Sequence, residues 1–208
     1  SARIERWLQL CHEGALAVCQ PSTPASYFHL LRTHAYVNWH RPVVVATPKS
    51  MLRGKQAVSK PTDFTQGRWE PAIGDPTVAD RSQVRRVLLC SGKVRWDLVT
   101  ARAEAGLEGK VAIISLERLY PLPAKELAAQ LAAYPADADI RFVQDEPENQ
   151  GAWWFLQQHL PEAVAAFLPG YQLRMTGVTR PAASAPSVGS LKVHRQQQEE
   201  LMARALAE

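Results

Sequence analysis

The feature that most constrains the fold is the alternation of short apolar runs with helical patterns along residues 86–207. Runs rich in apolar residues occur at 86–90, 111–115, 140–143 and 173–178, and all are short enough to be strands. The intervening segments carry apolar residues at helical spacing, such as Leu127 and Leu131. The alternation therefore predicts an α/β unit with a mainly parallel sheet and helices on both faces.

The predicted helices of this unit have definite inner faces. We expect the helix after residue 93 to bury Val94, Leu98, Ala101 and Ala105, and the helix after Gly151 to bury Trp153, Leu156, Leu160, Val164 and Phe167. Trp154 falls one residue off that face, which favours a surface position at a domain or subunit contact. A polar helix is expected over residues 190–207.

A smaller set of the same elements precedes this unit. Residues 4–11 have helical spacing, residues 15–19 form a short apolar run, and Thr23 can cap a helix that has Pro24 in its first turn. Residues 43–46 are Val-Val-Val-Ala, which is typical of a strand covered on both faces. Two α/β units are therefore expected.

Periodicity is lost between the two units, over residues 53–83. Glycine and proline recur there, and so long an irregular stretch is uncommon inside one compact domain. Because it contains Phe64 and Trp69, we interpret it as an ordered connection anchored by these two rings.

Composition excludes some classes of function. A net charge of +4 with scattered Lys and Arg residues does not indicate a nucleic-acid-binding protein. No apolar stretch approaches the roughly 20 residues of a membrane span. The cysteines Cys11, Cys19 and Cys90 are odd in number and have no metal-site spacing, so reduced thiols in a bacterial cytoplasm or a mitochondrial matrix are expected. The six histidines have no paired metal spacing either.

The sharpest local signal is the turn Ser91-Gly92-Lys93, which follows a predicted strand and precedes a helix. Backbone N–H groups and the positive end of the helix dipole face outward at such a turn, and this favours anion binding. The spacing is not that of a Walker A loop, because Val87 stands where its first glycine should be. Both a phosphate or nucleotide site and an ordinary turn with a solvated lysine are compatible with it.

The segment from Gln144 to Gln150 places three carboxylates after another predicted strand. They are Asp145, Glu146 and Glu148. Ligands bind at the carboxyl ends of parallel strands, and paired carboxylates can perform acid–base catalysis. Because no nucleophile or metal set accompanies them, helix capping or an interface role is favoured over catalysis.

Several motifs, taken in order, resemble the C-terminal part of the thiamine-diphosphate-dependent E1 component of 2-oxoglutarate dehydrogenase. They are Pro21-Ser22-Thr23-Pro24, Thr47-Pro48-Lys49-Ser50, Cys90-Ser91-Gly92-Lys93-Val94, Leu116-Glu117-Arg118-Leu119-Tyr120-Pro121, and Gln144 through Trp153. The resemblance implies a transketolase-like C-terminal domain over residues 84–208. It also implies that residues 1–52 are the tail of the pyrimidine-binding domain and that residues 53–83 connect the two.

The resemblance also implies the activity of the intact enzyme. Such enzymes decarboxylate 2-oxoglutarate on thiamine diphosphate with Mg²⁺ and transfer a succinyl group to the lipoyl domain of the E2 succinyltransferase, in the tricarboxylic acid cycle. They are homodimers. The family has an active-site His in His-Ser-Ser-Ala-Arg, and Ser1 matches its second Ser, so the catalytic, diphosphate and Mg²⁺ residues are expected in E1 domains upstream. This chain alone is not expected to bind the cofactor or to be active.

Actinobacterial relatives are similar at Asp75-Pro76-Thr77-Val78 and Arg118–Pro123, and in them an acetyl-CoA activator binds on the C-terminal side. The resemblance and the turn together suggest a CoA-type regulatory site at Lys49, Ser91, Gly92, Lys93 and Gln144. The chain departs from these relatives at Thr33, at Arg95-Trp96 in place of a Tyr pair, and at Asp145 in place of a Glu.

Two alternatives stay open at this point. One is another transketolase-like E1, against which the Cys90–Lys93 and Glu146–Trp153 motifs argue. The other is a free-standing nucleotide-binding or interaction module.

Overall fold

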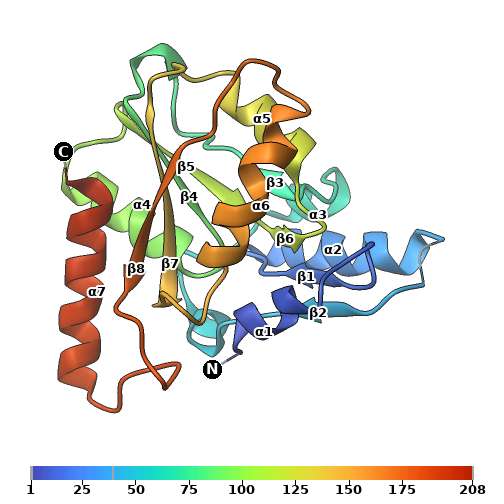
Figure 1. Ribbon diagram of the computed structural model, residues 1–208, viewed down its shortest axis with the longest axis horizontal. Helices are drawn as coiled ribbons and strands as arrows, with labels where there is room; N and C mark the ends of the chain where they lie inside the picture. The colour runs from blue at the N-terminus through green and yellow to red at the C-terminus, as the bar shows by residue number, and fades with distance from the viewer. Residues whose placement is uncertain (1, 39, 208) are drawn as a thin grey trace.

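The computed structural model describes residues 2–38 and 40–207, so Ser1, Trp39 and Glu208 lie outside the described part. Strands and helices alternate along the chain and form two sheets of unequal size (Figure 1). The five-stranded sheet forms the centre of the molecule, and the three-stranded sheet with its helices lies beside it, on the right in this view.

The larger sheet has the expected parallel topology. Its strand order is β3 (Ala72–Ile73), β5 (Val111–Leu116), β4 (Arg86–Cys90), β7 (Asp139–Pro147) and β8 (Met175–Arg180). Adjacent strands from β5 to β8 are parallel, and β3 is antiparallel to β5. The strands expected at 86–90, 111–115, 140–143 and 173–178 are therefore confirmed, with shifted ends.

Helices cover both faces of this sheet, as expected. One face carries α4 (Val94–Glu104) and α7 (Leu191–Leu206); the other carries α5 (Ala124–Leu131), α6 (Trp153–Ala165) and the short α1 (Ile4–Gln9). Strand β4 shows why both faces need covering. Its Val87 and Leu89 belong to the core under α5 and α6, whereas Leu88 and Cys90 belong to the core under α4 and α7.

The smaller sheet has the order β2 (Val43–Val45), β1 (Ala17–Cys19) and β6 (Arg118–Tyr120). Strands β1 and β2 are parallel, and the helix α2 (Pro24–Tyr36) between them starts at the predicted cap, where Ser26 N donates to Thr23 Oγ1 at 3.0 Å. The prediction that β2 is covered on both faces is wrong, because this strand lies at the edge of the sheet and its three valines are only half-buried.

The segment between the units is ordered and partly integrated into the larger sheet. It begins at the end of the 3₁₀ helix Lys49–Arg53 and contains the helix α3 (Pro61–Thr65), strand β3 and the 3₁₀ helix Arg81–Gln83. The two predicted anchors are confirmed: Phe64 packs edge-on against Phe28 at 5.6 Å between ring centroids, and Trp69 packs against the cluster that includes Leu30. The domain limits at residues 52 and 83 stay a prediction.

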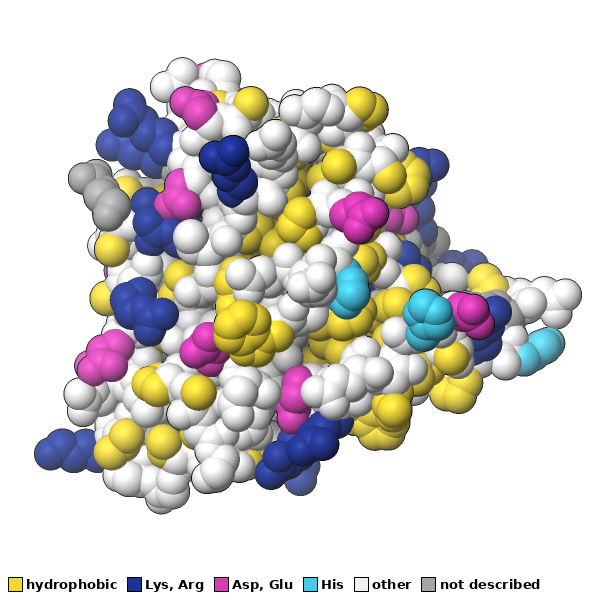
Figure 2. All heavy atoms as spheres, in the orientation of Figure 1, with side chains coloured by type: hydrophobic (Ala, Val, Ile, Leu, Met, Phe, Trp, Pro, Cys, Tyr) yellow, Lys and Arg dark blue, Asp and Glu magenta, His cyan; other side chains and the backbone are white. Residues whose placement is uncertain are grey.

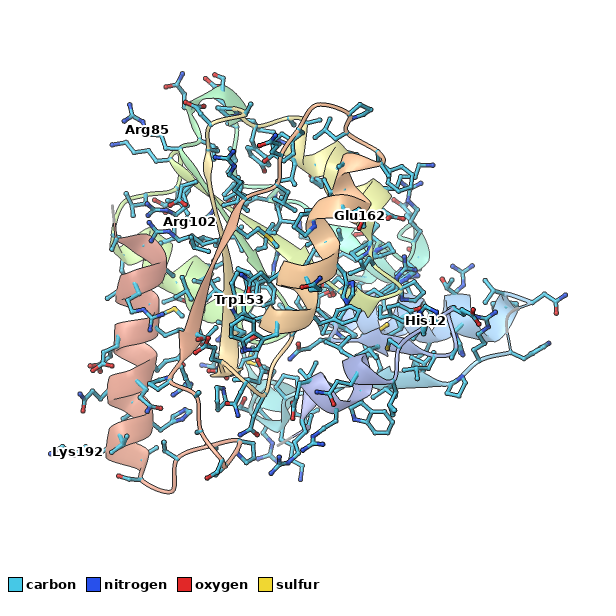
Figure 3. All side chains as sticks on the ribbon, viewed as in Figure 1. His12, Arg85, Arg102, Trp153, Glu162 and Lys192 are labelled. Atoms are coloured by element: carbon cyan, nitrogen blue, oxygen red, sulfur yellow. The ribbon has the colours of Figure 1, made fainter. Side chains whose placement is uncertain are left out.

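Two expected inner faces need correction. On α4, Ala105 is exposed and Arg102, labelled in Figure 3, is buried instead, because its Nη1 and Nη2 atoms donate to Asp75, Thr77 and the carbonyl of Val111. After α6, Phe167 is 55% exposed because the helix ends at Ala165 and the chain turns away from the core. The other predicted residues of that face are buried, and Trp154 is exposed, as expected.

In the part of the chain that the structure describes, no helix is long and apolar enough to cross a membrane. Figure 2 shows acidic and basic side chains interspersed over the visible face.

Candidate functional site

The larger sheet has a crevice at the carboxyl ends of two neighbouring parallel strands, where the helices that follow them lie on opposite faces of the sheet. Strand β4 continues into α4 on one face, and its neighbour β7 continues into α6 on the other face (Figure 1). In open parallel sheets, ligands bind between the carboxyl ends of two such strands. A cavity of about 180 Å³ lies at this point, and we call it the switch-point crevice. Its polar lining includes Arg3, Gln20, Ser91, Lys93, Asp145, Glu146 and Gln150.

The turn Ser91-Gly92-Lys93 is shaped by contact with the smaller unit. Ser91 Oγ donates to Gln20 Oε1 at 2.6 Å. Gly92 has φ +63°, and a Cβ at this position would lie 2.7 Å from Cγ of Gln20. Only glycine fits both this backbone conformation and this close approach.

Lys93 is positively charged, and it forms ion pairs with neighbouring carboxylates. Its Nζ lies 2.6 Å from Asp97 Oδ2 and 3.1 Å from Asp145 Oδ2. Burial alone would lower the pKa of Lys93, but Asp145 and Asp97 together raise it above its ordinary value. Lys93 is therefore a fixed cation between two carboxylates.

Asp145 links three elements around the crevice. Its Oδ1 accepts a hydrogen bond from Arg180 Nη2 at 2.9 Å, while its Oδ2 faces Lys93. These two cations outweigh burial and hold the pKa of Asp145 below its usual range. Arg180 also donates to Gln197 and Gln198 of α7. The network therefore joins β7 and β8 to α4 and α7.

Glu146, the next residue, has the opposite electrostatic character. Burial raises its pKa, and the charge of Asp145 raises it further. Its side chain accepts a long hydrogen bond from Gln20 Nε2 at 3.4 Å and a further one from its own backbone N–H. Glu146 is thus the carboxyl group of this site that takes up a proton most readily.

The structure brings together part of the predicted regulatory site. Ser91 and Lys93 line the crevice, and Gly92 shapes the turn between them. Lys49 is the first residue of a 3₁₀ helix and is not among the lining residues, although the preceding Thr47 and Pro48 are. Gln144 is buried behind the crevice, where its amide donates to Pro147 O and accepts from Trp153 N, both at 2.9 Å. Its contacts hold the start of α6.

The polar lining residues Arg3, Gln20 and Gln150 were not predicted as site residues. Gln20 directly follows β1, so its position at a strand end was a usable signal. Gln150 carried no such signal, because its place depends on the loop after β8, where its Nε2 donates to Ala183 O at 2.6 Å.

A larger hollow adjoins the crevice and shares Asp145, Glu146 and Pro186 with it. Its volume is about 660 Å³, and residues 180–190 form most of its wall. Asn149 holds this loop by two hydrogen bonds of 3.0 Å to the backbone of Ala183. The proline-containing segment between β8 and α7 is therefore the wall of a cavity.

A buried carboxylate joins the two units next to this site. Glu117 is fully buried and accepts hydrogen bonds from Ser22 N and Oγ, Ser26 Oγ and Ser115 Oγ at 2.5–2.8 Å. Trp96 Nε1 donates to Ser22 O at 2.8 Å. These contacts lock the start of α2 onto the larger sheet.

Among the residues that the structure describes, the other reactive groups form no catalytic arrangement. Burial raises the pKa values of the Cys19 and Cys90 thiols to about 12, so neither is a ready nucleophile. Over residues 2–38 and 40–207, no three His, Cys, Asp or Glu side chains are grouped as a metal ion would require.

Comparison with known proteins agrees with this architecture. Residues 58–206 match the family described as 2-oxoglutarate dehydrogenase C-terminal, and residues 1–55 match the transketolase pyrimidine binding domain. The chain is 46% identical to the 2-oxoglutarate dehydrogenase E1/E2 component of Corynebacterium glutamicum over 206 residues, which are 99% of this chain and 16% of that protein.

Two further relatives are equally similar. The 2-oxoglutarate dehydrogenase E1 component of Cupriavidus necator is 46% identical over 207 residues, which are 100% of this chain and 21% of that protein. The multifunctional 2-oxoglutarate metabolism enzyme of Mycolicibacterium vanbaalenii is 46% identical over 209 residues, 99% of this chain and 16% of that protein. The chain thus spans about a fifth or less of the length of these relatives. Since the first family matches most of its residues, the chain belongs to the 2-oxoglutarate dehydrogenase C-terminal family, with a pyrimidine-binding segment of the transketolase type before it.

Proposed function

We propose that this chain is the C-terminal part of a 2-oxoglutarate dehydrogenase E1 component. The intact protein would decarboxylate 2-oxoglutarate with thiamine diphosphate and Mg²⁺ and pass the succinyl group to the lipoyl domain of an E2 succinyltransferase. The observation that carries the proposal is 46% identity over the whole chain to relatives of that name. The intact enzyme would be a homodimer in a bacterial cytoplasm, or in the mitochondrial matrix of a eukaryote.

The role of this part is structural. Strand β6 of the larger unit completes the sheet of the smaller unit, and Glu117 fixes the start of α2. Edge strand β2 and the exposed apolar residues of α2, including Phe28 and Leu31, form a surface of the kind that marks contact with other protein. We propose that upstream E1 domains of the same polypeptide cover it.

Thiamine diphosphate would supply the nucleophilic carbon for decarboxylation. Because the described residues hold no grouped Mg²⁺ ligands, they do not fit the metal, and we assign no chemical step to them. The test is calorimetric titration of thiamine diphosphate with Mg²⁺. We expect saturable binding to the full-length protein and none to residues 1–208. Micromolar binding to the short chain would overturn the assignment of the cofactor to upstream domains.

A second, regulatory function is favoured by the convergence of two strand ends on one crevice. We propose that a CoA-type activator such as acetyl-CoA contacts this region through Lys49, Ser91, Gly92 and Lys93, while Gln144, buried behind the crevice, holds the start of α6. Thr47 and Pro48, next to Lys49, line the same cavity as Ser91 and Lys93, which supports a shared rim.

The test is Lys93→Ala in the full-length protein. A charge-assisted hydrogen bond to phosphate is worth roughly 1.5–3 kcal/mol, so half-maximal activation should need about 10- to 100-fold more acetyl-CoA. Each variant is compared with its own unstimulated rate, and Lys125→Ala, at an exposed position on α5, serves as the control. If acetyl-CoA activates Lys93→Ala as it activates the wild type, the turn has only a structural role.

A further inference from the structure

We propose that Arg95 receives a carboxylate from outside this chain, namely an Asp or Glu side chain of the upstream domains of the intact polypeptide. The inference rests on one part of the proposed function, that this chain is the C-terminal part of a longer protein. It concerns the first turn of α4, away from the switch-point crevice. Arg95 is not among the residues that line that crevice or the adjoining hollow.

Arg95 is a cation that this chain buries without a counter-ion. The residue is 8% exposed, and arginine side chains keep their positive charge in proteins. Its Nη1 is buried and finds no hydrogen-bond acceptor, and no ion pair within residues 2–38 and 40–207 includes this side chain. Because an unpaired buried charge is strongly unfavourable, an anion is expected beside it in the complete protein.

Arg102 shows how this fold satisfies a buried guanidinium on the same side of α4. It is 2% exposed, pairs with Asp75, and donates to Thr77 Oγ1 and Val111 O at 2.9 Å. Arg95 lies seven residues earlier, which is close to two helical turns, so the two side chains leave the helix in similar directions. Among the described residues, Arg95 has no partner of this kind.

The position of Arg95 is at the junction of the two units. Helix α4 follows β4, and β5 is parallel to β4, so the first turn of α4 lies near the carboxyl ends of both strands. Burial raises the pKa of the Cys90 thiol at the end of β4, and the nearby charge of Arg95 opposes this rise. The next residue, Trp96, donates from Nε1 to Ser22 O at 2.8 Å, directly before α2. A group that contacts the start of α2 can therefore also reach the first turn of α4.

The buried and half-buried carboxylates around this junction already have partners. Glu117 accepts hydrogen bonds from three serine hydroxyl groups and one backbone N–H at 2.5–2.8 Å. Asp97 pairs with Lys93 at 2.6 Å, and Asp75 pairs with Arg102. The counter-ion of Arg95 is therefore expected from outside this chain.

A carboxylate of an incoming domain suits this position better than a free anion. Its two oxygens match the planar guanidinium in a bidentate pair. The neighbouring helix α2 exposes Tyr27, Phe28 and Leu31, so the surface assigned above to the upstream domains continues to this junction. The chain spans 16–21% of the length of its relatives, so an intact protein of that size has further domains to supply the group.

The test replaces Arg95 by Met, a neutral unbranched side chain, in the full-length protein. Because Arg95 makes no hydrogen bond or ion pair among the described residues, the change removes no polar contact that this chain makes. In the intact protein it leaves a buried carboxylate unpaired, so the melting temperature should fall by at least about 2 °C. Arg95→Lys keeps the charge but not the planar fork, and it should melt between the two.

A matched control separates this effect from the loss of any surface charge. Arg85→Met makes the same replacement at an exposed position, labelled in Figure 3, and should melt with the wild type. A structure of the full-length protein then identifies the partner, as a carboxylate oxygen about 3 Å from the Arg95 guanidinium. Neutralising that carboxylate together with Arg95→Met should restore part of the lost stability, because neither charge is then left alone.

A free anion is distinguished by adding phosphate or acetate. If either raises the melting temperature of the wild type more than that of Arg95→Met, the counter-ion is a solute and the proposal is wrong. It is also wrong if Arg95→Met melts with or above the wild type, or if the full-length structure shows no foreign carboxylate at Arg95. None of these measurements uses turnover, so inactivity on 2-oxoglutarate would refute the proposed function without deciding this inference.

Discussion

Arg102 lies in the core as a cation with 2% exposure, and its neighbours explain how the fold tolerates it. It pairs with Asp75, and its other hydrogen bonds go to Val111 O and Thr77 Oγ1 at 2.9 Å. Asp75 in turn accepts from Ile113 N at 2.9 Å. Burial would raise the pKa of Asp75, but the hydrogen bonds that it accepts from Thr77, Arg102 and Ile113 lower it. This pair therefore joins the segment before β4 to β5 and α4.

Removing Asp75 should destabilise the fold strongly. Asp75→Ala leaves Arg102 buried without its counter-ion, and breaking a buried pair in this way costs about 3–5 kcal/mol. Asp137→Ala, at an exposed position, should stay within about 0.5 kcal/mol of the wild type. Urea unfolding followed by circular dichroism measures both, and equal stabilities for the two variants would refute the structural role of the pair.

Ionisation of Glu146 should destabilise the folded state, because the pKa of this carboxyl is raised above its value in the unfolded chain. The folded state then binds the proton more tightly, so stability falls as pH rises from the unfolded pKa of about 4.3 through the folded pKa. Glu146→Gln removes this penalty. The variant should be more stable than the wild type at pH 7, and this advantage should shrink towards pH 4. Thermal melts at both pH values decide it, and an advantage that does not change with pH would contradict the account.

Among the helices and strands, the sequence predicted those whose signal lies within their own residues. Strands β4, β5, β7 and β8 are apolar runs, and α2 has its cap at Thr23, so both kinds of signal lie within a few residues. Strands β3 and β6 have only two and three residues. They exist because they pair with distant strands, and no local pattern records such pairing.

The connection between the units should be the first place where a protease cuts. Arg53 and Lys55 are exposed, one at the end of a 3₁₀ helix and the other in the irregular stretch before α3, and neither is followed by proline, whereas β3 onward is held in the sheet. Brief trypsin treatment should therefore cleave after these two residues, as mass spectrometry of the first fragments would show. Replacing both by glutamine should delay the first cut. Early cleavage within residues 86–143 would instead disprove the two-unit organisation.

For the molecule as a whole, the location of the candidate site was more predictable than its chemistry. Ser91 and Lys93 follow a strand end, and parallel topology brings such ends together. The matching of Lys93 by Asp97 and Asp145 depends on side-chain geometry across three elements, which strand positions do not reveal. The place of Gln150 likewise depends on how the loop at Ala183 folds back.

The central claim, that this chain completes a 2-oxoglutarate dehydrogenase E1, is tested most directly by CO₂ release from carboxyl-labelled 2-oxo acids. The full-length protein, supplied with thiamine diphosphate and Mg²⁺, should release CO₂ from 2-oxoglutarate and much less from pyruvate. Residues 1–208 alone should release none. Full-length protein that is inactive on 2-oxoglutarate, or that prefers pyruvate, would contradict the account.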